Sequence, residues 1–371
     1  MEKYLNKNYD FKRNLVTNKI MFRKKGDENF KFLDEIEQNT LVIKLQKKGH
    51  NVTLNSLDMY LYSHYVNSYD PFKEYFENLP EWDKSKDYIS QLANTVNTNN
   101  NEYFTWIFKK WLVALVACSF NEEITNQAVI IFSGEQGVGK TTWFRNLLPN
   151  EIKDYFFEGN IIPNDKDTKF HLADKLIIFM DEITSIDKSK NEFYKGLISL
   201  NYIEQRRPYA RQSHRLMRRA SFVGSTNNLE ILTDLTGNRR YLCVEAQSFD
   251  FKTDIDLDKI YSQAMYLYKN GFQFFFDKEE IKKIELENKK FLKTPEEYDL
   301  IEMLFEHPCE KCKNVFYSAS EVLEYIKQNA KLYKNVSVEQ IGKALVSQGY
   351  KKRTKQKKYE LRLKNTILNV A

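Results

Sequence analysis

The feature that most constrains what this chain can fold into is an eight-residue loop, GEQGVGKT, at residues 134–141. It matches the phosphate-binding pattern G-x-x-x-x-G-K-[ST] at every fixed position. In this pattern the glycines let successive backbone N–H groups face a phosphate chain, the lysine reaches the β- and γ-phosphate oxygens, and the threonine hydroxyl can bind Mg²⁺. The sequence therefore predicts a nucleoside triphosphate site, with ATP and Mg²⁺ as the expected cofactors.

The residues on both sides of the loop are those that the motif requires. Residues 128–132 are a short apolar run that predicts a buried strand, and residues 140–147 predict a helix that begins at the loop. This context disfavours the alternative interpretation, an ordinary glycine turn. The residues expected to contact the nucleotide are Gly134, Glu135, Gln136, Gly137, Val138, Gly139, Lys140, Thr141 and Thr142.

Polar side chains follow the next two predicted strands, at residues 175–180 and 220–226. The carboxyl ends of parallel strands meet at one edge of a sheet, where α/β folds bind ligands. There Asp181, together with Thr141, is expected to hold Mg²⁺, and Glu182 to polarise the attacking water. Asn227 can reach the γ-phosphate or the water. An Asp-Glu pair also begins helices and an Asn also forms turns, so the position after a strand is what favours catalysis.

A pair of arginines, Arg239 and Arg240, stands in a turn before a further predicted strand. Arginine is suited to meeting γ-phosphate charge, and an arginine supplied by a neighbouring subunit can accelerate hydrolysis by about 10³–10⁵. The alternative is surface ion pairing.

Positive charge is concentrated in two stretches of the chain. The net charge is only +6, yet residues 206–219 hold six arginines and no acid, and residues 351–364 hold eight lysines and arginines against one glutamate. This distribution favours a polyanionic partner contacted at two places. For either stretch alone, a solvated surface is an equally good interpretation.

Composition excludes several classes of protein. With 371 residues and 42% apolar content the chain is expected to be globular, with two or three domains. The most apolar run, residues 111–120, follows two lysines and predicts a buried helix, not a membrane span. The N-terminus has no apolar signal region, and four cysteines make no disulfide framework, so a cytoplasmic protein without membrane contact is expected.

The cysteines are not expected to be functional. Cys309 and Cys312 form a single C-x-x-C pair, and His307 would supply at most a third ligand, so zinc binding is disfavoured. Cys118 and Cys243 lie in apolar runs and are expected to be core residues.

The rest of the first 300 residues gives coarser predictions. Short strands are expected near residues 9–11, 22–23 and 41–43, and a helix over 54–66. Residues 71–83 hold two prolines and several aromatic residues and are expected to connect the N-terminal region to the next domain. Residues 86–120 are expected to be helical apart from a polar loop at 97–101, and residues 148–174 to be irregular. Helices are expected again over 257–292, forming a lid.

The C-terminal region predicts three helices followed by a basic hairpin. The helix starts are at Thr294, at Ser318 and at Ser337, each as a capping box, and the first also has a proline in its first turn. Strands are expected at 350–353 and 359–363. This order is the outline of a winged helix, which usually contacts duplex DNA but in some cases binds only protein. The expected DNA contacts are Lys351, Lys352, Arg353 and Lys355.

Several motifs in order resemble one known family. They are Pro71-Phe72, residues 79–83, the loop at 134–142, Asp181-Glu182, residues 206–209, residues 223–227 and residues 236–240. Together they resemble the ATPase region of the virulence-associated protein E family, which is similar to the poxvirus-type primase-helicases of superfamily 3 among the AAA+ helicases. The resemblance covers about half of the chain.

The resemblance implies a ring-forming motor with ATP bound between subunits, in a homo-oligomer expected to be a hexamer. Arg240, or else Arg239, would be the finger that reaches the neighbouring nucleotide, and Asn227 the polar sensor. Residues 203–219 would form a hairpin that grips single-stranded DNA in the channel. Its expected contacts are Arg206, Arg207, Tyr209, Arg211, His214 and Arg215. No primase or zinc-binding pattern stands upstream, so primer synthesis is not expected.

The predicted fold is α/β, an AAA+ P-loop ATPase core with a parallel sheet. The predicted parts are an N-terminal α+β region (1–85), a helical lead-in (86–125), the core (126–250), a helical lid (251–293) and a winged-helix domain (294–371). The predicted function is an ATP-dependent DNA helicase in the replication of a phage, prophage or other mobile element, with replication proteins as possible partners. The alternative is an initiator or regulatory ATPase that assembles on DNA without unwinding it.

Overall fold

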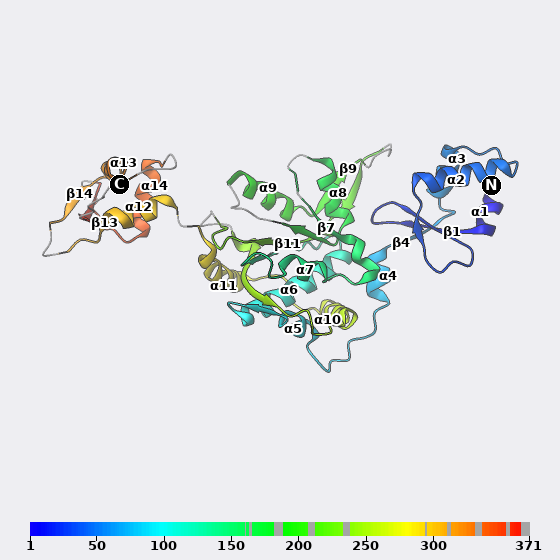
Figure 1. The fold of residues 1–371 in the computed structure, drawn as a ribbon, viewed down its shortest axis with the longest axis horizontal. Coiled ribbons are helices and arrows are strands. Elements are labelled where there is room, and N and C mark those ends of the chain that lie inside the picture. The colour runs from blue at the N-terminus through cyan, green and yellow to red at the C-terminus, as the bar shows by residue number, and fades with distance from the viewer. Residues whose placement is uncertain are drawn as a thin grey trace. The chain divides into compact units, whose positions relative to one another are not determined.

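The structure, a computed structural model, describes residues 1–159, 161–162, 165–181, 188–206, 212–232, 238–293, 295–309, 313–330, 336–353 and 357–364. Five of the predicted site residues lie outside these ranges: Glu182, Arg207, Tyr209, Arg211 and Lys355. The chain divides into two compact units, unit 1 over Met1–Phe291 and unit 2 over Leu292–Ala371 (Figure 1). The finer boundaries within unit 1 stay predictions.

Unit 1 begins with a four-stranded sheet in the order β3-β2-β1-β4. Its elements are α1 (Glu2–Asn8), β1 (Tyr9–Asn14), β2 (Ile20–Lys24), β3 (Lys31–Phe32), α2 (Glu35–Lys47), α3 (Leu54–Leu61) and β4 (Asn67–Tyr69). The predicted strand at 41–43 is wrong because these residues lie within α2. The Asp34 side chain caps that helix by accepting from the Glu37 N–H, and Leu41 and Leu45 bury one of its faces.

The centre of unit 1 is a six-stranded sheet in the order β5-β12-β6-β11-β8-β7. Its strands are β5 (Val96–Thr98), β6 (Val129–Ser133), β7 (Phe156–Glu158), β8 (Ile177–Met180), β11 (Ser221–Thr226) and β12 (Tyr241–Phe249). All neighbours are parallel except β5, which pairs antiparallel with β12. The prediction of a mixed α/β fold with a parallel sheet is confirmed.

Two expectations for the edges of this sheet are wrong. The polar loop predicted at 97–101 contains part of β5, where Val96 and Thr98 are buried on either side of exposed Asn97. The irregular stretch predicted at 148–174 contains η1 (Asn150–Tyr155), β7 and α8 (Lys166–Asp174). β5 and β7 have three residues each, which is too few to show a strand periodicity in the sequence.

Helices and one hairpin complete unit 1. They are α4 (Pro71–Glu77), α5 (Tyr88–Ala93), α6 (Asn101–Phe120), α7 (Lys140–Arg145), α9 (Lys188–Ser199), β9 (Tyr202–Gln205), β10 (His214–Met217), η2 (Asn238–Arg240), α10 (Leu257–Lys269), α11 (Lys278–Asn288) and η3 (Lys289–Phe291). α6 is apolar and long enough to cross a membrane, but 78% of its most apolar window is buried inside the unit. α10 packs against α5 and α6, and its Ile260 and Ala264 belong to the main core.

Unit 2 combines three helices with a small antiparallel sheet. Its elements are α12 (Glu296–Leu304), β13 (Phe305–Glu306), β14 (Val315–Tyr317), α13 (Ala319–Asn329), α14 (Val338–Ser347), β15 (Lys352–Arg353) and β16 (Lys358–Leu363). The capping boxes at Ser318 and Ser337 are confirmed. The sequence did not predict β13 and β14, which pair with opposite sides of β16.

Candidate functional site

The predicted phosphate loop leaves the end of β6 and leads into α7. Gly134, Gly137 and Gly139 have φ angles of 147°, 83° and 109°, in the region that favours glycine. Two of them are also needed for space. A Cβ on Gly134 would lie 2.3 Å from the Ala246 carbonyl oxygen, and one on Gly139 would lie 2.8 Å from the Phe251 ring. The loop is therefore shaped by close contact with the end of β12.

Lys140 is held inside the loop by oxygen atoms. Its side chain is buried, and its Nζ donates to the carbonyl oxygens of Gly134 and Glu135 at 2.6 and 2.7 Å and to the Asn227 Oδ1 at 3.1 Å. Burial lowers the pKa of Lys140, and the negative charge of Asp181 opposes that shift. Among the described residues, the hydrogen-bond acceptors of this buried ammonium are uncharged oxygens, so Lys140 is well suited to bind an anion.

The end of β8 adds a carboxylate to the same place. Asp181 Oδ1 accepts a hydrogen bond from the Ser225 hydroxyl of β11 at 3.1 Å. A cavity of about 260 Å³ lies between these groups. It is lined by Gln136, Gly137, Gly139, Lys140, Thr141, Thr142, Asp181, Ser225, Thr226 and Asn227. Thus the structure brings the predicted nucleotide ligands to one edge of the sheet, with Glu182 outside the described residues.

This donor set fits a magnesium-bound nucleotide. The hydroxyl of Thr141 and the carboxylate of Asp181 border one cavity, and hard oxygen ligands of this kind are what Mg²⁺ takes. A larger cavity of about 910 Å³ lies by β1, β2 and η1, but none of the predicted nucleotide ligands lines it. We therefore assign the nucleotide site to the smaller cavity, because of the side chains that line it and not because of its volume.

Ser225 is a site residue that the sequence prediction missed. Residues two apart on a strand face the same side, and Ser225 stands two before Asn227. The sequence could have indicated Ser225, because it is a polar residue two positions before Asn227 in a predicted buried strand.

Arg239 and Arg240 lie at the opposite edge of the sheet. They form η2 immediately before β12, whose Tyr241 pairs with Val129 at the start of β6. The loop follows the other end of β6, where Ser133 pairs with Glu245. At about 3.3 Å per residue the strand separates the two edges by more than about 13 Å. The arginine pair therefore does not line the cavity of its own phosphate loop.

Arg240 is half-buried and Arg239 is exposed. Burial, and next the positive charge of Arg239, lower the pKa of Arg240. Both arginines border a cavity of about 340 Å³ with Phe274, Phe275 and Phe276.

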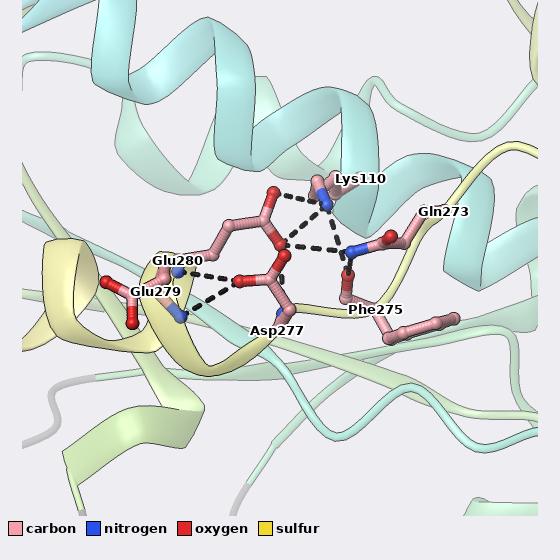
Figure 2. A network of polar contacts seen from close by, with 6 residues as sticks. All are labelled: Lys110, Gln273, Phe275, Asp277, Glu279 and Glu280. Carbon is pink, nitrogen blue, oxygen red and sulfur yellow. Dashed lines mark hydrogen bonds and ion pairs between the residues drawn. The ribbon is translucent and has the colours of Figure 1, made fainter.

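A buried lysine fixes the loop that carries these phenylalanines (Figure 2). Lys110 of α6 is 5% exposed, lies 2.6 Å from a Glu280 carboxylate oxygen and donates to the Phe275 carbonyl oxygen at 3.1 Å. Asp277 caps α11 by accepting from the N–H groups of Glu279 and Glu280. Phe275 itself is 62% exposed, so a loop whose backbone is held by Lys110 presents an aromatic side chain to solvent near the two arginines.

The segment between α9 and β11 forms a hairpin, as expected. β9 and β10 pair antiparallel, with His214 opposite Gln205 and Arg215 opposite Glu204. The Arg215 guanidinium lies 4.2 Å from the centre of the Tyr202 ring. Arg206 is exposed at the end of β9. These described residues place His214, Arg215 and Arg206 on one hairpin.

The last two arginines of this basic stretch anchor the hairpin. Arg218 is 1% exposed and donates to the carbonyl oxygens of Ile198 and Asn126 at 2.8 and 3.1 Å. Arg219 pairs with Asp70 at 3.0 Å. Arg218 and Arg219 were not among the expected DNA contacts, and their side chains are used within unit 1.

The comparison with family models decides the family of the chain. A model described as the virulence-associated protein E-like domain matches residues 76–293, more than half of the sequence. The chain belongs to this family. No curated protein matches it.

Several solved structures are similar to this virulence-associated protein E-like chain. The apo C-terminal region of NrS-1, residues 305–718, aligns over 98% of each chain with a TM-score of 0.47 and 11% identity in its A form. Another apo structure of that region covers 77% of this chain and 73% of its own, with a TM-score of 0.45 and 14% identity. The SCCmec type IV Cch active helicase covers 95% and 92%, with a TM-score of 0.36 and 11% identity.

Unit 2 of this virulence-associated protein E-like chain presents basic side chains on β15 and at the residue before it. Lys351, Lys352 and Arg353 are exposed. The Arg353 guanidinium lies 4.2 Å from the Phe316 ring centre. Cys312 is outside the described residues, and among those described no group of three or more His, Cys, Asp or Glu side chains could hold a metal ion.

Proposed function

We propose that this chain is the ATP-hydrolysing subunit of an oligomeric DNA helicase that serves the replication of a phage, prophage or other mobile element. One observation carries the proposal. Lys140, Asp181 and Asn227 gather at one edge of the sheet, while the arginines suited to a γ-phosphate lie at the opposite edge. A site divided in this way is completed when subunits stack edge to edge.

Each described residue of the loop edge has a role in this proposal. Lys140 exchanges its carbonyl acceptors for phosphate oxygens, and Thr141 and Asp181 hold Mg²⁺, with Ser225 orienting the carboxylate. Asn227, released from Lys140, contacts the γ-phosphate or the water. Magnesium-bound ATP supplies the phosphoanhydride bond that is broken. Glu182 would polarise the attacking water.

Arg240 would complete the site of the next subunit. Burial, and next the positive charge of Arg239, lower the pKa of Arg240, so an incoming phosphate would offset both the burial of the charge and the repulsion between the two guanidinium groups. Phe275, fixed by Lys110, supplies apolar contact beside it. A ring, expected to be a hexamer, satisfies every such contact.

The hairpin of β9 and β10 would grip single-stranded DNA. Arg218 and Arg219 fix its base to the body of unit 1, so that movement of the body reaches the tip. Its basic side chains suit phosphates and its tyrosines suit bases. The proposed contacts are Arg206, Arg207, Tyr209, Arg211, His214 and Arg215. Unit 2 would act as a winged helix on duplex DNA through Lys351, Lys352, Arg353 and Lys355.

Strand displacement from a forked duplex tests this function. The full chain should unwind the fork with ATP and Mg²⁺ and should form larger assemblies with an ATP analogue and single-stranded DNA. A chain that remains monomeric under all conditions would exclude the divided site. DNA-stimulated hydrolysis without unwinding would instead favour an initiator or regulatory ATPase.

A further inference from the structure

We infer that a second hollow, which adjoins the phosphate cavity where Gly139 contacts Phe251, holds the base of the bound nucleotide, with the Phe251 ring as the surface on which the base stacks. This inference rests on the proposed function, because it assigns the nucleoside part of the same ligand.

The hollow has a volume of about 440 Å³ and lies at the end of β12. It is lined by Asn94, Thr95, Asn97, Ser248, Phe249, Asp250, Phe251 and Lys252. The Phe251 ring is 50% exposed and stacks on Phe249, with centroids 6.1 Å apart and planes 20° apart. Part of the Phe251 ring is thus covered by Phe249, and the rest of it lines the hollow.

Gly139 connects the hollow to the phosphate site. It lines the cavity of Lys140 and Asp181, and a Cβ at this position would lie 2.8 Å from the Phe251 ring. The two cavities therefore adjoin at the contact between Gly139, which lines one, and Phe251, which lines the other. In a nucleoside triphosphate a single ribose separates the base from the phosphates, so a hollow next to Gly139 is within reach of the base of a nucleotide whose phosphates lie on the loop.

The walls of the hollow are tied to the helix that follows the loop. The Trp143 indole N–H of α7 donates to the Thr95 hydroxyl at 2.9 Å, and the Asp250 N–H donates to the Thr95 carbonyl oxygen at 2.7 Å. Thr95 is buried. These contacts hold Thr95 and Asp250 in place relative to α7 and the phosphate loop. A site that is ordered before the ligand arrives loses less entropy on binding.

The chemistry of the lining suits a base. A base stacks on an aromatic ring whatever its sequence identity, and side-chain amides can both donate to and accept from its polar edge. Asn97 is held by donating to Gln247 at 3.2 Å. The Asp250 carboxylate accepts from the N–H groups of Lys252 and Thr253 and so fixes the turn that carries Phe251.

Binding of ATP and of inorganic triphosphate to the full chain with Mg²⁺, measured by calorimetry, tests the inference. Phe251→Ala and Phe251→Leu should weaken ATP binding about tenfold, because base stacking is worth on the order of 1–3 kcal/mol. Both should leave triphosphate binding within about twofold, and Phe251→Trp should retain ATP affinity. The leucine variant keeps apolar contact with Gly139, which separates stacking from support of the loop.

Two results would overturn the inference: unchanged ATP binding in Phe251→Leu, or an equal loss for ATP and triphosphate in both variants. The proposed function has a separate readout, because Lys140→Ala should weaken both ligands. If Lys140→Ala left both unchanged, the nucleotide site itself would be refuted whatever Phe251 does.

Discussion

The two edges of the parallel sheet in unit 1 are built from different residues. At the carboxyl edge, glycines and small polar side chains leave a cavity in which Lys140 meets only oxygen atoms. At the amino edge, Arg218 is buried on carbonyl oxygens while Arg240 is half-buried beside an open cavity. Arg218 thus has a structural role, whereas Arg240 can contact a ligand or a neighbouring subunit. The difference in burial distinguishes these two arginines.

The largest expected effect tests the amino edge. Arg240→Ala should lower ATP turnover by about 10³–10⁵ while nucleotide binding is retained, because a finger acts on the transition state. Steady-state hydrolysis and equilibrium binding measure the two quantities. Arg239→Ala, at the exposed neighbour, is the matched control. An equal loss of turnover in Arg239→Ala would contradict the assignment of the finger to Arg240 alone.

Mixing variants shows whether the edges act across subunits. Arg240→Ala subunits retain their loop and Lys140→Ala subunits retain their arginine, so mixed assemblies should recover part of the activity that each lacks alone. Absence of recovery in assemblies shown to be mixed would contradict a divided site.

The carboxyl edge should respond differently. Lys140→Ala should reduce both nucleotide binding and turnover, the latter by about 10²–10³, because the lysine contacts the phosphates before and during hydrolysis. Lys153→Ala, in η1 and exposed, should change neither quantity. A Lys140→Ala variant with normal binding would mean that the loop holds no phosphate.

A stability measurement tests the structural arginine. Arg218→Met should lower the free energy of unfolding by about 3 kcal/mol, because two buried carbonyl oxygens lose their donor. The same change at exposed Arg206 should cost less than about 0.5 kcal/mol. Urea denaturation compares the two, and equal effects would show that Arg218 is not an anchor.

The smallest expected effect concerns Asp87, which lies at neither edge of the sheet. Burial raises the pKa of Asp87, but hydrogen bonds from Lys109, Ser90 and Gln263 outweigh it and bring the pKa to about 2. The stabilisation is therefore complete above about pH 4 and is lost as the pH falls toward 2.

Asp87→Asn should thus cost about 1 kcal/mol at pH 7, a figure reduced for partial exposure, and the difference from wild type should shrink between pH 4 and 2. Denaturation at several pH values measures it. A difference that grew on acidification would contradict the depressed pKa.

The sequence predicted the carboxyl edge better than the rest of the chain. Continuous apolar runs that end at Asp181 and Asn227 identify both strands, because parallel strands bury both faces. β5 was missed because its partner is remote: Asn97 and Gln247 bond across 150 residues. Nothing local distinguishes Arg218 from Arg215, since their difference depends on Ile198 and Asn126. Phe251 carries no signal without its contact to Gly139.

The close approach of Gly134 to Ala246 has a mechanical consequence. β12 begins next to Arg240, passes the loop at Ala246 and ends two residues before Phe251. It is hydrogen-bonded on both sides, by β5 and β6, and leaves no room for a Cβ at Gly134. A displacement of this strand along its axis therefore moves the arginine edge and the loop together. One continuous strand about 30 Å long therefore joins the arginine pair, the phosphate loop and the segment that carries Phe251.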